Sequence, residues 1–438
     1  MSRGDEDLYK AAEQGDAEAQ FALGQMYEKG VDGGGDDAEA AHWYFMAAEQ
    51  GHAVAQFSLG YMFASGRGVP KDYEESVKWF SNAASQGHAD AQYILGMMYE
   101  NAQGVPKDTT EAIRWYYKSA EQGDVKAQLR LASIYSNGSI ADTDDVEAAS
   151  WYHKAAEHGD ANARYELGLM YSQGRGVVQD YGISIYWYRL AAEQQDDRAL
   201  YALGLMSASG RGMPKDYEVA ENWWRQAAEL GNTKAQFALG NIYEHGYGAE
   251  KDVVQAVSWY QRAGENGDAE AQRVLGFMYC NGVGISTDYA AAIKWFDMAA
   301  KQGDSKAKYN LGIMYKKAQG VDLDIGKAVR LFKESAEDGL ASAEYSYGIM
   351  HYDGLGVSQD YDEAQRWFRK SADQGYANAQ LMMAFIYYSG HGVQRDYSEA
   401  LVWADRAAAR GEGSALELRK AIEARITMER MAASQRSA

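Results

Sequence analysis

The side chains best suited to catalysis or metal binding are few and scattered. Two histidines, His153 and His158, lie five residues apart and would sit on different faces of a helix, and no other pair recurs at a metal-ligand spacing. We therefore expect no metal site and no cofactor. No nucleophile can be paired with a base, so the sequence does not predict an enzyme. The eight histidines are His42, His52, His88, His153, His158, His245, His351 and His391.

The single cysteine, Cys280, excludes an intramolecular disulfide and favours a reducing compartment. No basic residue beside it in sequence would lower the pKa of its thiol, so a half-buried structural role is favoured over a reactive one.

Two glycine-rich segments invite comparison with phosphate-binding loops. They are Gly66-Arg67-Gly68 and Gly174-Arg175-Gly176. Both recur between helical patterns without a preceding strand, so turns are the favoured interpretation. Their recurrence points to a repeat.

The chain has a period of 36 residues from Gly24 onward. Tryptophan follows the same period, with Leu331 as the only gap. Eleven repeats fill positions 16–411, about nine tenths of the chain. The small-residue ladder is Gly24, Gly60, Gly96, Ala132, Gly168, Gly204, Gly240, Gly276, Gly312, Gly348 and Ala384. The tryptophan ladder is Trp43, Trp79, Trp115, Trp151, Trp187, Trp223, Trp259, Trp295, Trp367 and Trp403.

The residue pattern within each repeat predicts two helices joined by a glycine-rich turn. Ala55, Leu59, Met62 and Phe63 fall on one face of the first helix. Asp or Asn stands at the expected cap of many first helices. No repeat alone can bury both apolar faces, so the repeats must stack into a solenoid. The expected caps include Asp16, Asp124, Asp160, Asn232, Asp268 and Asp304.

The repeat pattern resembles the Sel-1-like repeat, a longer relative of the tetratricopeptide repeat. The segments that carry the resemblance are Ala55–Phe63, Gly66–Tyr73, Val77–Phe80 and Ala83–Gly87, and it extends over all eleven repeats. It implies an all-α, right-handed superhelical solenoid of antiparallel helix pairs, with the first helices on the concave side. Similar proteins, often bacterial, are scaffolds or adaptors that hold a partner protein or peptide there.

Two other functions are alternatives to a scaffold. Some similar proteins are hydrolases, but no catalytic pair is visible here. A regulatory subunit that modulates an enzyme or a secretion or signalling component is the remaining alternative. The oligomeric state stays open.

Two segments flank the repeats. Residues 1–15 match the second half of a preceding repeat, and residues 412–438 predict an amphipathic helix that covers the open end, followed by a short tail. No apolar run suits a secretory signal or a membrane span, so a cytoplasmic protein is expected, non-classical export remaining open. The net charge of −20 disfavours nucleic acid and would attract a basic segment of a partner.

A candidate partner-binding surface follows from the first helices. The residues opposite their core faces turn apolar in repeats eight to eleven, and a smaller cluster occurs in repeats three to six. Burial by neighbouring first helices is the alternative. The aromatic column that includes Phe57 and Tyr93 is expected mainly to pack between repeats. The candidate residues are Val274, Phe277, Ile313, Ile349, Met382, Phe385, Ile94, Met97, Leu169 and Leu205.

Overall fold

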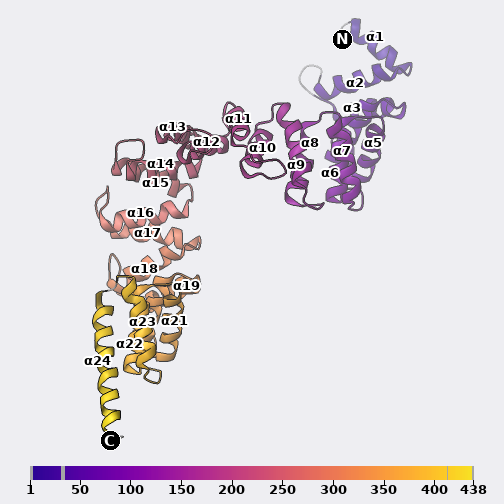
Figure 1. Cartoon of the computed structure of the whole chain (residues 1–438). Coiled ribbons are helices and arrows are strands. Elements are labelled where there is room, and N and C mark those ends of the chain that lie inside the picture. Colours follow the sequence, from indigo (N-terminus) through magenta and orange to yellow (C-terminus); the bar gives the residue numbers. More distant parts are fainter. Residues whose placement is uncertain (1–2, 31–34, 412, 437–438) are drawn as a thin grey trace. The chain divides into compact units, whose positions relative to one another are not determined.

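A computed structural model describes residues 3–30, 35–411 and 413–436. Within these residues all regular secondary structure is helical, and consecutive helices pack as pairs (Figure 1). The chain divides into an N-terminal body, Met1–Asp216, and a C-terminal body, Tyr217–Ala438. The predicted all-helical stack of helix pairs is confirmed.

Each repeat supplies a first helix, here called the A helix and carrying an even number from α2 to α22, and a second or B helix. The N-terminal body contains α1 (Arg3–Glu13), α2 (Ala17–Lys29), α3 (Asp37–Glu49), α4 (Ala53–Ser65), α5 (Tyr73–Ser85), α6 (Ala89–Asn101), α7 (Thr109–Glu121), α8 (Val125–Asn137), α9 (Asp145–Glu157), α10 (Ala161–Gln173), α11 (Tyr181–Ala192) and α12 (Asp197–Ser209). The C-terminal body contains α13 (Tyr217–Glu229), α14 (Thr233–His245), α15 (Val253–Glu265), α16 (Ala269–Asn281), α17 (Tyr289–Lys301), α18 (Ser305–Lys317), α19 (Ile325–Glu337), α20 (Ala341–Asp353), α21 (Tyr361–Asp373), α22 (Ala377–Ser389), α23 (Tyr397–Ala409) and α24 (Gly413–Arg436).

Side-chain caps fix where the helices begin. Asp124 Oδ1 accepts a hydrogen bond from the Ala127 amide at 2.7 Å, and the other expected caps act in the same way. His52 and His88 replace the acid at α4 and α6, each accepting an amide hydrogen bond through Nδ1. These histidines therefore have structural roles.

The glycine ladder brings the two helices of a repeat together. A Cβ atom on Gly96 would lie 2.7 Å from a ring carbon of Tyr116, so only glycine permits this approach. The ring against the ladder glycine is a tyrosine or phenylalanine and belongs to the residue after the ladder tryptophan, as with Phe80 after Trp79. Trp79 instead packs into the core of the preceding repeat.

A glutamine ladder that the sequence analysis missed also joins the repeats. The buried Gln92 donates through Nε2 to the Ala84 carbonyl at 3.0 Å, and its Oε1 accepts from Gln122 at 2.7 Å. The same pattern recurs in other repeats. Because buried amides must be hydrogen-bonded, this ladder fixes the register between neighbouring repeats.

The final helix α24 packs against α22 and α23. Ala415 and Ile422 are fully buried, and Leu418 and Ile426 lie against the same core. The helix continues to Arg436, into the segment expected to be a tail, and residues 437–438 lie outside the described residues.

Candidate functional site

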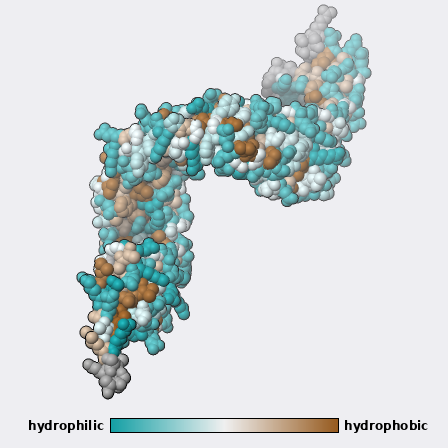
Figure 2. All heavy atoms as spheres, viewed as in Figure 1, coloured by the Kyte–Doolittle hydropathy of each residue, from teal (hydrophilic) through white to brown (hydrophobic). Residues whose placement is uncertain are grey.

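All ten candidate residues lie on A helices and none is fully buried. Four are exposed: Met97 by 37%, Leu205 by 45%, Phe277 by 56% and Phe385 by 38%. The other six are half-buried. The surface they follow, called here the A-helix face, therefore combines packing between repeats with apolar area open to solvent. Figure 2 shows apolar residues as separate patches on a mostly hydrophilic surface.

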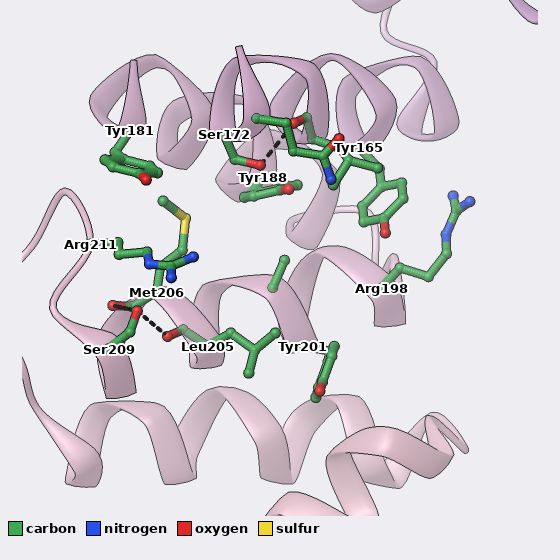
Figure 3. A pocket seen from close by; sticks show the side chains of 13 residues that line it. Tyr165, Ser172, Tyr181, Tyr188, Arg198, Tyr201, Leu205, Met206, Ser209 and Arg211 are labelled. Carbon is green, nitrogen blue, oxygen red and sulfur yellow. Dashed lines mark hydrogen bonds between the residues drawn. The ribbon is translucent and has the colours of Figure 1, made fainter. Parts of the chain in front are cut away.

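Leu169 and Leu205 meet in a pocket between α10 and α12, with a volume of about 290 Å³ (Figure 3). Met206 adds to its apolar wall, and Tyr165 and Tyr188 close it from α10 and α11. The rings of these two tyrosines lie 5.8 Å apart. Burial raises the pKa of Tyr188 to about 12, so this phenol stays neutral.

The charge at one end of this α10–α12 pocket is internally balanced. Arg198 Nη2 lies 2.6 Å from Asp196 Oδ2, and its guanidinium carbon stands 4.3 Å from the centre of the Tyr165 ring. Glu166 lies farther away, 3.8 Å from Arg198 Nη1, and burial raises the pKa of its carboxyl. Arg198 therefore brings little uncompensated charge to the pocket.

Arg211 lines the other end and is exposed. Among the described residues its side chain forms no ion pair, and no aspartate or glutamate lines this pocket. Ser172 and Ser209 hydroxyls donate to the carbonyls of Leu169 and Leu205 at 2.8 and 2.7 Å. This end is thus polar and carries one unneutralised positive charge.

Ile349, Met382 and Phe385 meet in a second apolar groove, with a volume of about 470 Å³, between α20, α22 and α24. Leu418 of α24 lines it, and Asp353 contributes a carboxylate at its edge. The capping helix therefore forms part of the wall of this α20–α22 groove as well as covering the core.

Ile94 lines a third and more polar pocket of about 540 Å³, together with Tyr93 of its own helix α6 and with Phe57 and Tyr61 of α4. Its charged lining residues are Glu28, Asp90 and Lys126. Met97 lies on the same helix, outside this pocket. The Phe57 and Tyr93 rings also pack on the B-helix aromatics Phe80 and Tyr116 of their own repeats, and the Phe57 ring stacks on His88, which caps the next A helix.

Val274, Phe277 and Ile313 lie outside these three cavities, on α16 and α18. Ile313 packs against the core cluster that contains Tyr347, whereas Phe277 projects into solvent. Both α16 and α18 are A helices, and they approach each other directly. The predicted stripe is therefore interrupted: its best-formed part is the α20–α22 groove.

Catalytic groups do not gather on this surface. In the described parts of the chain no cluster of three or more histidine, cysteine, aspartate or glutamate side chains could hold a metal ion. Burial raises the pKa of the half-buried Cys280 thiol, which disfavours the reactive thiolate. No helix of the described residues is long and apolar enough to cross a bilayer.

The repeat geometry agrees with comparisons to known proteins. The sequence model of the Sel1 repeat matches eleven consecutive segments from residue 17 to residue 412. The chain belongs to the Sel1 repeat family. No match was found among curated proteins.

Two crystal structures of Sel1 repeat proteins are similar over most of their lengths. One is c5321, a protective antigen present in uropathogenic Escherichia coli strains, with 37% identity, a TM-score of 0.76, and coverage of 96% of this chain and 90% of that one. The other is a Sel1 repeat protein from Oxalobacter formigenes, with 34% identity, a TM-score of 0.61, and coverage of 72% and 91%. This Sel1 fold is typical of protein-interaction scaffolds.

Sequence reasoning found Leu169 and Leu205 but missed Arg211, Tyr181 and Ser172 beside them. The sequence does contain a signal that distinguishes Arg211 from the equivalent arginines. In other repeats an arginine at the position of Arg211 has an acid 30 residues earlier, and here that position holds Tyr181.

Proposed function

We propose that this Sel1 repeat protein is a scaffold or adaptor that binds a partner protein or peptide through its A-helix face. The observation that carries the proposal is the α20–α22 groove, where Phe385 is exposed beside the half-buried Ile349 and Met382. A continuous apolar groove between rigid helices suits the apolar side of an amphipathic segment.

The charge of the chain supports a basic partner at this groove. Asp353 lies at its edge, no lysine or arginine lines it, and the whole chain carries a net charge of −20. Complementary charge would speed association and orient the bound segment, while the apolar contacts would supply most of the affinity. The single cysteine fits a cytoplasmic location for this interaction. A regulatory subunit would use the same surface and differ only in its effect on the partner.

The test replaces exposed apolar side chains without opening the core. Phe277→Ser with Phe385→Ser should remove protein retained by the tagged wild type from a lysate of the source cells. Ile313 and Ile349 are left unchanged because they are half-buried against core clusters. Circular dichroism should stay close to that of the wild type.

The matched control is Val254→Ser with Val402→Ser, which changes two exposed apolar residues on the B helices α15 and α23. This control should retain the same proteins as the wild type. If the Phe277/Phe385 variant retains as much protein as the wild type, the binding surface lies elsewhere. If the control variant loses as much protein as the Phe277/Phe385 variant, the retention reflects non-specific adhesion.

A further inference from the structure

Three arginines occupy the same turn position in different repeats: Arg67, Arg175 and Arg211. Two of them are neutralised within the chain. Arg67 Nη2 donates to Asp37 Oδ1 at 2.7 Å, and Arg175 Nη2 donates to Asp145 Oδ1 at 2.6 Å. In both cases the acid stands 30 residues before the arginine.

The repeat before Arg211 lacks this acid. Tyr181 stands 30 residues before Arg211, and Ser172 stands 39 residues before it, where Glu28 also pairs with Arg67. Among the described residues Arg211 forms no internal ion pair. The position therefore keeps its arginine but offers the charge to solvent and to the α10–α12 pocket.

The pocket beside Arg211 has a distinct chemistry. Figure 3 shows Arg211 next to Met206 and Tyr181 at one end, with Leu205 between it and the Arg198 end. The apolar wall of Leu169, Leu205 and Met206 would accept an apolar side chain. An unneutralised guanidinium at its edge would accept a carboxylate, because Arg–carboxylate hydrogen bonds are charge-assisted.

We propose that the α10–α12 pocket binds an internal acidic segment of a partner polypeptide. An apolar side chain of that segment enters between Leu169 and Leu205, and the side-chain carboxylate of a neighbouring aspartate or glutamate pairs with Arg211. This proposal rests on the proposed binding function but assigns a different body of the chain and a partner chemistry opposite to that of the α20–α22 groove.

A polypeptide fits this site better than a nucleic acid. Arg211 and the already paired Arg198 are the only basic residues among those that line the pocket, whereas nucleic acid binding draws on several phosphate contacts at once. The net charge of −20 would repel a polyanion but tolerate one carboxylate placed against one guanidinium.

The experiment uses fluorescein-labelled nonapeptides with blocked ends and the full-length protein. Each peptide has a central leucine or phenylalanine flanked by aspartate or glutamate, and a matched set replaces the acids by asparagine or glutamine. Fluorescence anisotropy should show about tenfold tighter binding of the acidic set, the effect of one charge-assisted hydrogen bond. Added salt should reduce this preference.

Variants identify the residue responsible. Arg211→Gln should abolish the preference for acidic peptides, and Leu205→Ser should weaken both sets. Both residues are exposed, so circular dichroism and melting should be unchanged. Arg67→Gln is the matched control because it removes an arginine at the same turn, away from this pocket, and should leave the preference intact.

Other outcomes overturn the proposal. Equal binding of the two sets, or a preference that survives Arg211→Gln, refutes the role of Arg211. Binding restricted to neutral peptides with a free carboxyl terminus, or to a single-stranded oligonucleotide, assigns another ligand. If neither peptide set binds the protein while Phe277→Ser with Phe385→Ser still removes the protein retained by the wild type, only this inference is wrong. The proposed binding function then stands.

Discussion

The glycine ladder gives the sharpest prediction about stability. Gly96 lies in the middle of α6, where alanine would normally stabilise a helix by about 1 kcal/mol. A Cβ there would lie 2.7 and 2.8 Å from two Tyr116 ring carbons and 3.1 Å from the Ala112 carbonyl oxygen. Overpacking costs about 1–3 kcal/mol, and these distances favour the upper end.

Moving the Tyr116 ring would carry a second cost. Its hydroxyl donates to Glu100 Oε2 at 2.7 Å, and Glu100 also pairs with Arg130. A hydrogen bond to a charged group contributes about 1.5 kcal/mol or more. We therefore expect Gly96→Ala to destabilise its repeat by about 2–4 kcal/mol, although the substitution improves helix propensity.

The repeat after Gly96 shows how the strain can relax. Ala132 replaces the ladder glycine there, and the equivalent ring, Tyr152, is 7% exposed, whereas Tyr116 is 0% exposed. A ring shifted outward in this way would bring the cost of Gly96→Ala toward about 2 kcal/mol.

Hydrogen exchange measures the effect where it occurs, because neighbouring repeats can open separately. Amides of α6 and α7 should exchange about 30-fold to about 1000-fold faster in Gly96→Ala. Gly326→Ala is the control: in α19 its Cβ would meet only Asp324 Oδ1 at 3.5 Å, so protection should stay or rise. Unchanged or increased protection of α6 and α7 in Gly96→Ala would refute the packing argument.

Two other predictions concern α11 and its neighbours. Trp187→Ala should reduce the free energy of unfolding by about 3–5 kcal/mol because Trp187 is buried in the core formed by α8, α9 and α10. Amides of these helices should then exchange faster. Unchanged protection of these amides would contradict the prediction. For Tyr188, burial raises the pKa from 10.0 to about 12, so the unfolded chain loses its proton first and the free energy of unfolding should fall as pH rises between these values. Tyr188→Phe should show a smaller fall in chemical denaturation, and an identical pH dependence would contradict the assignment.

The repeat could be predicted from the sequence because glycine and tryptophan recur at a fixed period that matches the packing of the helix pairs. Glycine allows the closest approach of a ring to the helix backbone, so its ladder marks close approach. What the ladder could not reveal is which ring fills the space, because Trp79 and Phe80 are adjacent and only their directions distinguish them. Leu331, the gap in the tryptophan ladder, packs against the core that contains Phe296 and so preserves the fold without the indole.

The binding surface was harder to predict because exposure depends on neighbouring repeats. Ile313 and Phe277 occupy equivalent positions 36 residues apart, yet Ile313 is half-buried and Phe277 is exposed. The periodic pattern identifies the A-helix face but not its cavities. Arg211 escaped notice because its importance lies in the acid that is missing at Tyr181, and that substitution becomes visible only when the ion pair of Arg175 is known.

The two cavities on which the proposals rest carry opposite charges. The α20–α22 groove has Asp353 at an apolar edge, whereas the α10–α12 pocket has Arg211 without a counter-charge. Both are built on A helices whose backbones are fixed by the same caps and ladders, so chemical differences between repeats need no change of fold. The residues that recur in every repeat hold the stack together, so the positions that differ between repeats are free to change the chemistry of the surface. The two proposals together would give one Sel1 solenoid separate sites for a basic and an acidic segment.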